Sequence, residues 1–405
     1  MSGKNRLRGL SNEHLEGIVL LLKNLKIWDG ESDSIDAGMD AVQIENGVIV
    51  DIGSSDTLKG ADERDMGGLY LIPGLIDAHV HMCLDPEIMN PADQLTERSV
   101  LLESMKTRAE SMLAAGITSA RDLGGGNWVE LELRDLINNG EIRGPRLVCA
   151  GQPITSVGGH CHFWGGETRS SAEIEAIMDR QAEKGVDLIK IMATGGTMTK
   201  GTLPSKAQFD QAFISEVVRQ AAKRDYSVAA HCHGTEGILF AARAGVKTIE
   251  HCSWVGEEGW GKHYDDEAVS EIVSANAWVS PTINAGWKRH QGKGGFENVL
   301  MDNFRKMKQA GVQLIASTDA GIPRVFHHHL PQALPVFAHI AGLTNLEVLK
   351  SATSDCAVAI GLGNHAGKIK PDFAADFVLY EVNPLENLSV LERPIEVWSR
   401  GLPYC

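Results

Sequence analysis

The chain has 405 residues, of which 43% are hydrophobic and 22% are charged, as in an ordinary globular protein and unlike a disordered or fibrous one. Fifty-three acidic residues against 38 basic ones give a formal charge of −15, which argues against nucleic acid or an anionic membrane surface as a partner. No apolar run approaches the roughly 20 residues of a membrane-spanning helix, and the apolar cluster at 18–22 is shorter than a signal-peptide core. We therefore expect a cytoplasmic protein that binds a small molecule.

The seven cysteines form no CxxC pair. They are Cys83, Cys149, Cys161, Cys232, Cys252, Cys356 and Cys405. An odd number without paired spacing favours buried free thiols in a reducing compartment over a disulfide framework or a cysteine-based zinc site.

Both ends of the chain are predicted to be rich in β-strand. Apolar stretches at 20–28 and 41–53 are strand-like, and the turn residues at 45–47 predict a hairpin inside the second. Strand-like texture returns near the other end, at 367–371, 375–382 and 394–401. We predict that residues 1–70 and 367–405 build one small β-sandwich from the two ends.

Residues 71–366 alternate amphipathic segments of helical period with short apolar runs. Four helical segments end in a glycine directly before such a run, at Gly116, Gly185, Gly245 and Gly311. Glycine fits the left-handed position just past a helix end, so the recurrence suggests parallel βα units. Eight candidate strands lie at 73–81, 117–123, 146–151, 186–192, 226–232, 247–252, 278–283 and 313–319. Eight such units predict an α/β fold, a (β/α)₈ TIM barrel, in which active-site residues come from the carboxyl ends of the strands.

The strongest functional signal lies at the end of the first predicted barrel strand, where His79 and His81 stand two residues apart in GLIDAHVH. Alternate residues of a strand share a face, so both imidazoles project the same way, roughly 7 Å apart along the chain. That spacing lets two ring nitrogens converge on one metal ion. A lone pair of this kind is weak evidence, because core histidines produce it often.

Three further predicted strand ends carry side chains that bind metals. They are His231 and His233 in VAAHCHG, His251 in TIEHC and Asp319 in STDAG. His251 alone suits a core histidine and Asp319 alone suits a helix cap, but all of them at one end of a barrel are hard to ascribe to packing. Nitrogen and carboxylate ligands of this kind suit Zn²⁺ or another borderline divalent ion.

Lys190 lies between two isoleucines near the end of a central strand and would be buried. A bare ammonium is unfavourable there, so it must pair with a carboxylate or lose its proton. A neutral amine can take up CO₂ to become a carbamate, N6-carboxylysine, whose oxygens can bridge two metals. An isolated lysine would favour the structural pairing, whereas the surrounding histidine and aspartate strand ends favour the carbamate.

Over nearly its whole length the sequence resembles the amidohydrolase superfamily. The closest similarity is to the prolidase-like and Xaa-Arg carboxypeptidase-like branch, often labelled imidazolonepropionase-like. The resemblance is carried by PGLIDAHVH, GGH at 158–160, IKIMATGG, AAHCHG, TIEHC, STDAG and AADFVLYEVNPL at 374–385. These motifs are highly specific for the superfamily and less specific for any one substrate.

The resemblance implies a binuclear centre of two divalent metal ions, which we expect to be Zn²⁺. The implied ligands are His79, His81 and Asp319 for the more buried ion, His231 and His251 for the more exposed ion, and carboxylated Lys190 bridging both. His233 would then face the substrate. Asp319 is also the implied catalytic residue, which takes a proton from the attacking hydroxide and delivers it to the departing nitrogen.

Further substrate contacts are expected from loops that follow the strands. His160 comes after a glycine pair and would contact a carbonyl or carboxylate. Thr194 and Gly195 would offer backbone N–H groups to an anionic end of the substrate. Arg324 is the best-placed cation for a substrate carboxylate, and a solvated loop arginine explains it equally well.

We therefore predict a binuclear-metal hydrolase that cleaves the amide bond of a dipeptide or N-acyl amino acid. The alternative is hydrolysis of a cyclic amide, urea, carbamate or ester, xenobiotic ones included, at the same centre. A catalytically dead scaffold would lack metal ligands, whereas all six positions are filled here. An acidic residue beside the predicted hydroxide argues against a mere metal-dependent binding module. Relatives are commonly oligomeric, so we expect a homo-oligomer.

Overall fold

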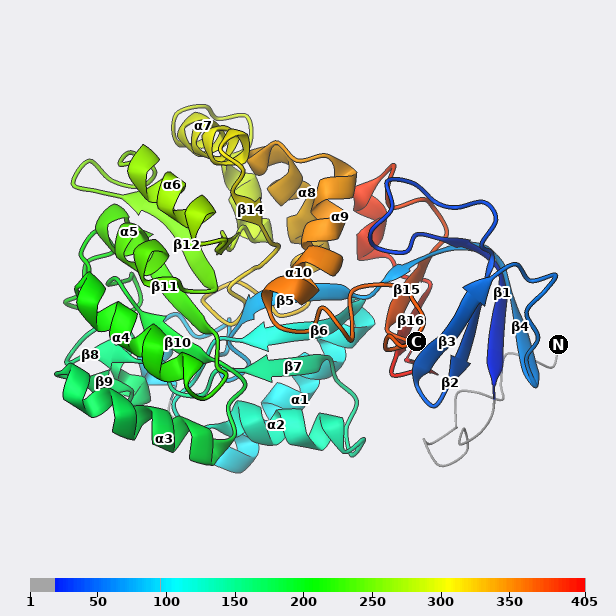
Figure 1. The fold of residues 1–405 in the computed structure, drawn as a ribbon, viewed down its shortest axis with the longest axis horizontal. Coiled ribbons are helices and arrows are strands. Elements are labelled where there is room, and N and C mark those ends of the chain that lie inside the picture. Colours follow the sequence, from blue (N-terminus) through cyan, green and yellow to red (C-terminus); the bar gives the residue numbers. More distant parts are fainter. Residues whose placement is uncertain (1–18, 95, 405) are drawn as a thin grey trace.

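The computed structural model describes residues 19–94 and 96–404, so predictions that concern residues 1–18 and Cys405 lie outside the described part. The chain has an α/β fold with two regions (Figure 1). One region is a sheet built from both ends of the chain, and the other consists of parallel strands with helices around them. In the described residues, no helix has the length and apolar character needed to cross a membrane.

The two chain ends meet in one seven-stranded sheet with the order β17-β16-β15-β4-β1-β2-β3. Its strands are β1 (Leu20–Ile27), β2 (Ala41–Glu45), β3 (Val48–Gly53), β4 (Asp62–Pro73), β15 (Phe377–Tyr380), β16 (Glu396–Ser399) and β17 (Leu402–Pro403). The junction between the two ends is the antiparallel pair of β15 and β4. Because β4 crosses residue 70 and runs directly towards the first parallel strand, it ties this sheet to the rest of the fold.

The predicted hairpin is confirmed, since β2 and β3 pair antiparallel on either side of Asn46 and Gly47. Both turn residues have positive φ, of 50° and 79°, which a two-residue hairpin turn requires. The strand predicted at 367–371 is wrong. That segment is irregular and is held by the Ile369 N–H, which donates to the carbonyl of Asp29.

The middle of the chain forms parallel strands in the order in which they occur in the sequence. One sheet contains β5 (Leu75–Val80), β6 (Ile117–Asp122) and β7 (Arg146–Cys149). The other contains β10 (Ile189–Met192), β11 (Val228–Gly234), β12 (Thr248–Val255), β13 (Trp278–Ser280) and β14 (Gln313–Leu314). A small pair, β8 (Thr155–Ser156) with β9 (Glu167–Thr168), lies in the connection between the two sheets. Each of the eight parallel strands overlaps one of the eight predicted strands.

Backbone hydrogen bonds continue across both gaps between these two sheets. On one side, the Ile154 N–H donates to the Lys190 carbonyl over 2.8 Å, which connects the chain after β7 with β10. On the other side, Asp319 donates to the carbonyl of His79, and His81 donates to the carbonyl of Ala320. A closed barrel requires contacts at these two places, and the closed (β/α)₈ barrel itself stays a prediction.

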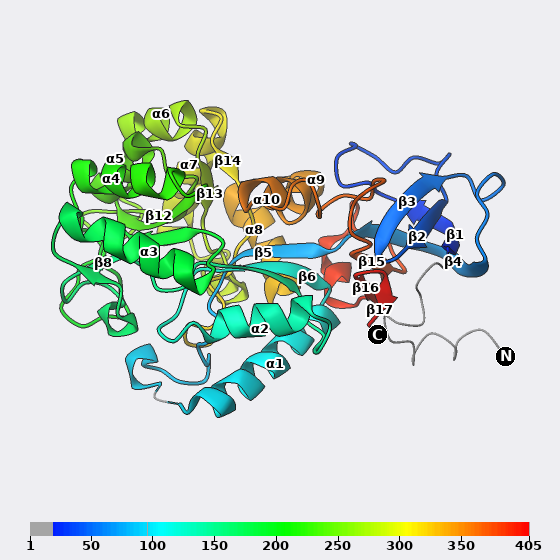
Figure 2. The same ribbon diagram turned by 60° about the horizontal axis from the view of Figure 1, so that its bottom comes forward.

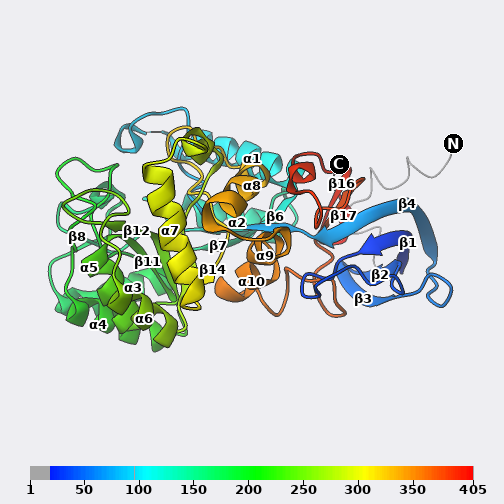
Figure 3. The ribbon, with the colours of Figure 1, turned by 90° about the horizontal axis from the view of Figure 1, so that it is seen from above.

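Helices cover the outside of the parallel strands (Figures 2 and 3). They are α1 (Arg98–Ala114), α2 (Val129–Asn138), α3 (Ile174–Lys184), α4 (Gln211–Ala222), α5 (Thr235–Ala244), α6 (Asp266–Ser274), α7 (Phe296–Gln309), α8 (Leu330–Ala341), α9 (Asn345–Ser351) and α10 (Ser354–Ala359). The glycines that follow α1, α3, α5 and α7 have positive φ, as their position before a strand predicted. The largest apolar core lies between strands and helices, and a separate one lies under the seven-stranded sheet.

Candidate active site

A cavity of about 710 Å³ lies where the carboxyl ends of β5, β10, β11 and β12 and the chain after β14 come together. Of the predicted site residues, it is lined by His79, His81, His160, Lys190, His231, His233, His251, Asp319 and Arg324. Residues from six segments far apart in the sequence therefore meet in one place, because the carboxyl ends of parallel strands share one edge.

The first histidine pair lies close to the aspartate. Nε2 of His79 is 3.3 Å from Nε2 of His81 and 3.3 Å from Oδ1 of Asp319. Nε2 of His81 is 3.5 Å from the same oxygen. Three groups with lone pairs thus lie close together, which makes this point a candidate metal position.

Two overlapping groups of ligand atoms could each hold a metal ion. His79, His251 and Asp319 form one group, and His231, His233 and His251 form the other, with the ligand atoms of each within 4.8 Å of one another. His251 belongs to both groups, so the two candidate positions are neighbours. His233 belongs to the same candidate group as His231 and His251. It is therefore a candidate metal ligand, although the sequence predicted only that it faces the substrate.

In most of these histidines one ring nitrogen forms a hydrogen bond with a neighbouring residue, and the other nitrogen remains available for a metal ion. Nδ1 of His81 is 2.8 Å from the carbonyl of Gly124, so this nitrogen carries the proton and Nε2 is free. Nδ1 of His251 is 2.8 Å from Oγ1 of Thr282, and Nδ1 of His233 is 2.9 Å from Oγ of Ser253. Such outer hydrogen bonds orient metal-binding imidazoles and select their tautomer.

Glu250 plays the same part for His79, and sequence reasoning missed it. Its Oε2 accepts from Nδ1 of His79 over 2.9 Å, and its Oε1 accepts from Nη2 of Arg121 over 2.8 Å. The remaining N–H groups of Arg121 donate to the Ala78 carbonyl and to Oγ1 of Thr248. The available signal was a charged residue directly before His251 in a buried strand, together with an arginine in β6.

Lys190 is buried, and its Nζ has no hydrogen-bond partner among the described residues. Burial lowers the pKa of this amine to about 8, with Arg121 acting in the same direction and Glu250 opposing it. An amine with that pKa is partly neutral near pH 7.5 and can react with CO₂. A buried nitrogen without a partner fits a carbamate that is completed by metal ions better than it fits a structural ion pair.

Burial also sets the charges of the other groups. It lowers the pKa of His79 and His160 to about 4 and that of His233 to about 3, so these imidazoles are neutral near pH 7. Burial alone would raise the pKa of Asp319, but the neighbouring His79 and His81 bring it to about 2. Neutral imidazoles around an ionised carboxylate are the protonation states that metal binding needs.

The backbone is strained where it presents these ligands. His251, Thr282 and Asp319 have φ values of 66°, 54° and 61°, in the left-handed region that residues with a Cβ seldom adopt. Each such residue costs on the order of 1–3 kcal/mol and persists only when its surroundings fix it. Strain of this kind clusters at functional sites, and here it turns side chains at strand ends into the cavity.

The predicted substrate contacts divide into two sets. His160 lines the cavity 4.6 Å from the His231 ring, centroid to centroid, and Gly196 leaves room for it because a Cβ there would overlap its ring. Arg324 also lines the cavity. Thr194 and Gly195 are not among the lining residues, and their N–H groups, predicted to bind the substrate, donate instead to the carbonyls of His231 and Lys206.

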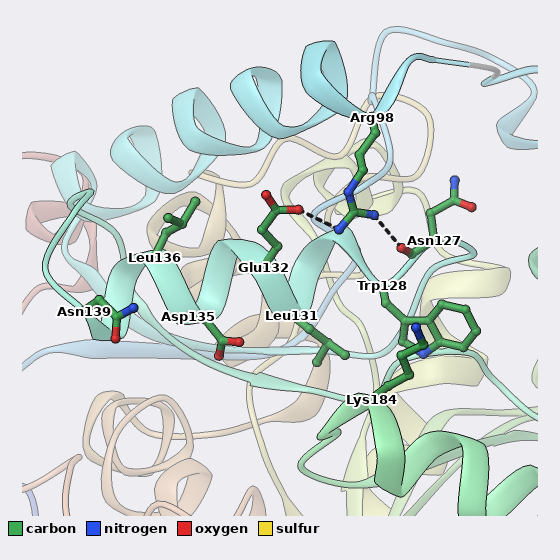
Figure 4. Close-up of a pocket in the computed structure, with 9 residues that line it drawn as sticks. All are labelled: Arg98, Asn127, Trp128, Leu131, Glu132, Asp135, Leu136, Asn139 and Lys184. Carbon is green, nitrogen blue, oxygen red and sulfur yellow. Dashed lines mark hydrogen bonds and ion pairs between the residues drawn. The ribbon is translucent and has the colours of Figure 1, made fainter.

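A second pocket of about 480 Å³ lies on the outer flank, between α2 and its neighbours (Figure 4). Arg98 spans its rim and donates to Oε2 of Glu132 over 2.6 Å and to the carbonyl of Asn127. Lys184 lies over the ring of Trp128 at 5.0 Å. None of the predicted site residues lines this pocket, and its cations already have partners, so the chemistry belongs to the first cavity.

Comparisons with known proteins identify the family of this chain. The sequence profile of the amidohydrolase family matches residues 70–402. The chain belongs to this family. It is therefore an amidohydrolase, an enzyme of a generally metal-dependent family that hydrolyses amide and other carbon–nitrogen bonds.

Individual relatives have different substrates in their names. The amidohydrolase is 28% identical over 375 residues to ochratoxinase of Aspergillus niger, an alignment that covers 82% of this chain and 75% of the relative. Among solved structures, a Xaa-Pro dipeptidase with bound methionine in its active site matches with a TM-score of 0.82 and 28% identity, covering 95% of this chain and 99% of the other. A prolidase complexed with N-methylphosphonate-L-proline has the same TM-score at 24% identity, with 95% and 99% covered, and shows the shared fold.

Proposed function

We propose that this amidohydrolase uses two divalent metal ions, most simply Zn²⁺, to hydrolyse the amide bond of an N-acyl amino acid or dipeptide with a free carboxylate. The observation that carries the proposal is the meeting of two histidine groups and an aspartate around Lys190 in one cavity. The similarity to a Xaa-Pro dipeptidase and to ochratoxinase supports an amide of an amino acid as the substrate.

The residues present suit such a pair of ions. His79, His81 and Asp319 would hold one ion, His231 and His251 the other, and Lys190, as its carbamate, would bridge them. Bound metal ions lower the pKa of a water molecule from 15.7 to about 7, which makes hydroxide available at neutral pH. The orphaned Nζ of Lys190 is the feature that supports the bridging carbamate.

Asp319 is the proton carrier of the proposed reaction. Its pKa of about 2 keeps it ionised, so it can accept the proton that the attacking oxygen loses as the carbon–oxygen bond forms. It then returns that proton to the nitrogen as the carbon–nitrogen bond breaks, which releases a carboxylate and a free amine. His160 and Arg324 lie where they can contact the carbonyl and carboxylate groups of the substrate.

The first test separates the catalytic role of Asp319 from its metal contact. In Asp319→Asn we expect retention of metal and a loss of turnover of roughly 10²–10⁴-fold, the range for general acid–base catalysis. Asp302→Asn, on the exposed face of α7, is the control for removing one carboxylate. Metal content by atomic emission and hydrolysis rates are both measured. A fully metallated Asp319→Asn enzyme with a near wild-type rate contradicts the role.

The second test addresses the substrate. Rates are compared across N-acyl amino acids, lactams and aryl carbamates under identical metal loading. The proposal expects the highest kcat/KM among N-acyl amino acids with a free carboxylate. Turnover confined to compounds without a carboxylate contradicts it and supports a cyclic amide, urea, carbamate or ester as the substrate.

A further inference from the structure

The cavity has a mouth with a chemical character unlike that of its floor. Its mouth is defined by four partly exposed aromatic residues, Trp260, Trp287, His290 and Phe296, and its floor by the more buried candidate metal ligands. None of these four aromatic residues contributes to either candidate metal group. The volume of about 710 Å³ lies in the upper half of the usual range for small-molecule sites, roughly 300–1,000 Å³. There is therefore room for a substrate group well beyond the reacting bond.

Trp260 is held in place and yet exposed. It is 37% exposed and is the only aromatic side chain among the large hydrophobic residues that are exposed in the described part of the chain. Its loop is anchored by the Gly261 N–H, which donates to the Ser253 carbonyl, and by the Asn303 amide, which donates to the Gly261 carbonyl. The ring stands edge-on to His233 with centroids 4.8 Å apart. A fixed apolar ring at the rim of a cavity is a surface for a ligand to cover.

A second aromatic group lines the same cavity. The rings of Trp287 and Phe296 are 6.1 Å apart at an interplanar angle of 30°, and His290 lies 5.3 Å from Phe296. Asn284 fixes the start of this segment, because its amide donates to the carbonyl of Thr318, the residue before Asp319. This second group is thus tied to the strand end that presents the proposed proton carrier.

Each tryptophan is followed two residues later by a cation, as Trp260-Gly-Lys262 and Trp287-Lys-Arg289. Both cations line the cavity, as does Arg324, and no ion pair joins any of the three to a carboxylate of the described residues. Glu258 is the acidic residue at the mouth. In a chain of formal charge −15, three unpaired cations around two aromatic walls favour an aromatic anion.

We propose that the preferred substrates are N-aroyl amino acids, whose planar aromatic acyl group lies between Trp260 and Trp287 and whose carboxylate faces Lys262, Arg289 and Arg324. This inference rests on the proposed function, because it names the acyl group of the same amide. A dipeptide with a free amino terminus is disfavoured, since its ammonium would lie beside three cations. The acyl carbonyl remains at the floor, where hydrolysis adds water to give the aromatic carboxylate and the amino acid.

The test compares acyl groups on one leaving group. N-(1-naphthoyl)-L-phenylalanine, N-acetyl-L-phenylalanine and glycyl-L-phenylalanine are hydrolysed by the fully metallated enzyme, and kcat/KM is measured for each. We expect the naphthoyl compound to exceed the acetyl compound at least ten-fold, which corresponds to about 1.4 kcal/mol. The glycyl compound should be the poorest of the three.

Single substitutions test whether Trp260 and Trp287 cause the preference for the naphthoyl group. Trp287→Ala should bring the naphthoyl-to-acetyl ratio towards one, and Trp260→Ala should do the same with metal content unchanged by atomic emission. Trp128→Ala is the matched control, because this tryptophan lines the flank pocket of Figure 4 and should leave the ratio intact. Arg289→Gln should raise KM for both N-acyl compounds alike.

The outcomes separate this inference from the proposed function. Good hydrolysis of all three compounds with no preference for the naphthoyl group overturns the aromatic subsite and leaves amide hydrolysis standing. Hydrolysis of none of them overturns the proposed function. The subsite is then judged by calorimetry alone, where 1-naphthoate should bind at least ten-fold more tightly than acetate and lose that advantage in Trp287→Ala. Equal affinities overturn it.

Discussion

Glu250 connects a predicted metal ligand to a buried arginine, and its replacement by glutamine is the most direct test of how the site is supported. The carboxylate accepts from His79 with one oxygen and from Arg121 with the other. Arg121 and His79 lower the pKa of Glu250 well below its usual range against the effect of burial, so the group is ionised at all ordinary pH values. Glu250→Gln preserves the shape, removes the charge and replaces one of the two acceptor oxygens with an NH2 donor.

The expected loss in the free energy of unfolding of Glu250→Gln follows from the surroundings of Arg121. Its side chain is 2% exposed, and Glu250 is its one carboxylate partner among the described residues. Removing one partner of a buried ion pair costs about 3–5 kcal/mol, because the other charge remains without compensation. The hydrogen bonds to Ala78 and Thr248 persist, so we expect a loss near the lower end, about 3 kcal/mol. His79 also loses the acceptor of its Nδ1 proton, which should weaken metal binding by roughly 10–100-fold.

Urea unfolding of metal-free protein measures the first effect, and metal retained after dialysis against a graded series of chelator concentrations measures the second. Glu132→Gln is the matched control, because it also breaks a carboxylate–arginine pair, but at the exposed rim of the pocket in Figure 4. Solvent screening limits that loss to about 1 kcal/mol or less. If Glu250→Gln unfolds like Glu132→Gln and holds metal like the wild type, the buried network does not support the site.

Two further predictions concern buried ionisable groups. Lys190→Met should hold fewer metal ions per chain by atomic emission without any loss of metal-free stability, because the amine has no partner to lose; two retained ions would refute the bridging role. Burial, with Asp122 nearby, raises the pKa of Glu130 from 4.5 to about 8. The unfolded chain therefore loses this proton first, and stability should fall as the pH rises from about 4.5 to about 8. Glu130→Gln should flatten that slope in urea unfolding curves, and an unchanged slope would assign it to other groups.

The arrangement of the site could be predicted from the sequence because hydrophobic periodicity and the positions of strand ends are local features. To bring together His79 near the end of β5, His81 just after it, His251 within β12 and Asp319 beyond β14, the prediction needed only the rule that parallel strands share a carboxyl edge. The helix-ending glycines likewise have the positive φ that their place before a strand predicts. Such patterns do not depend on which distant side chains come together.

The contacts that support the ligands could not be predicted in the same way. Thr282 and Ser253 bind their histidines across 31 and 20 residues of sequence, and nothing local marks a threonine or serine as such a partner. Thr194 and Gly195 were expected to offer N–H groups to the substrate, but they do not line the cavity. This difference also arises from contacts between distant parts of the sequence. The ladder between β10 and β11 extends past His231, whose carbonyl accepts from Thr194, so that backbone is already paired.

The division between floor and mouth bears on how a substrate can be assigned to this enzyme at all. A Xaa-Pro dipeptidase and an ochratoxinase are both similar to this chain, although their names point to different substrates. Family membership thus accounts for amide hydrolysis and leaves the substrate open, because specificity resides in particular side chains and not in the fold. In this chain the floor residues come from strand ends, whereas Trp260 and Trp287 come from connections between strands and helices. Such connections change without disturbing the strands. The substrate must therefore be determined from these two walls and their cations.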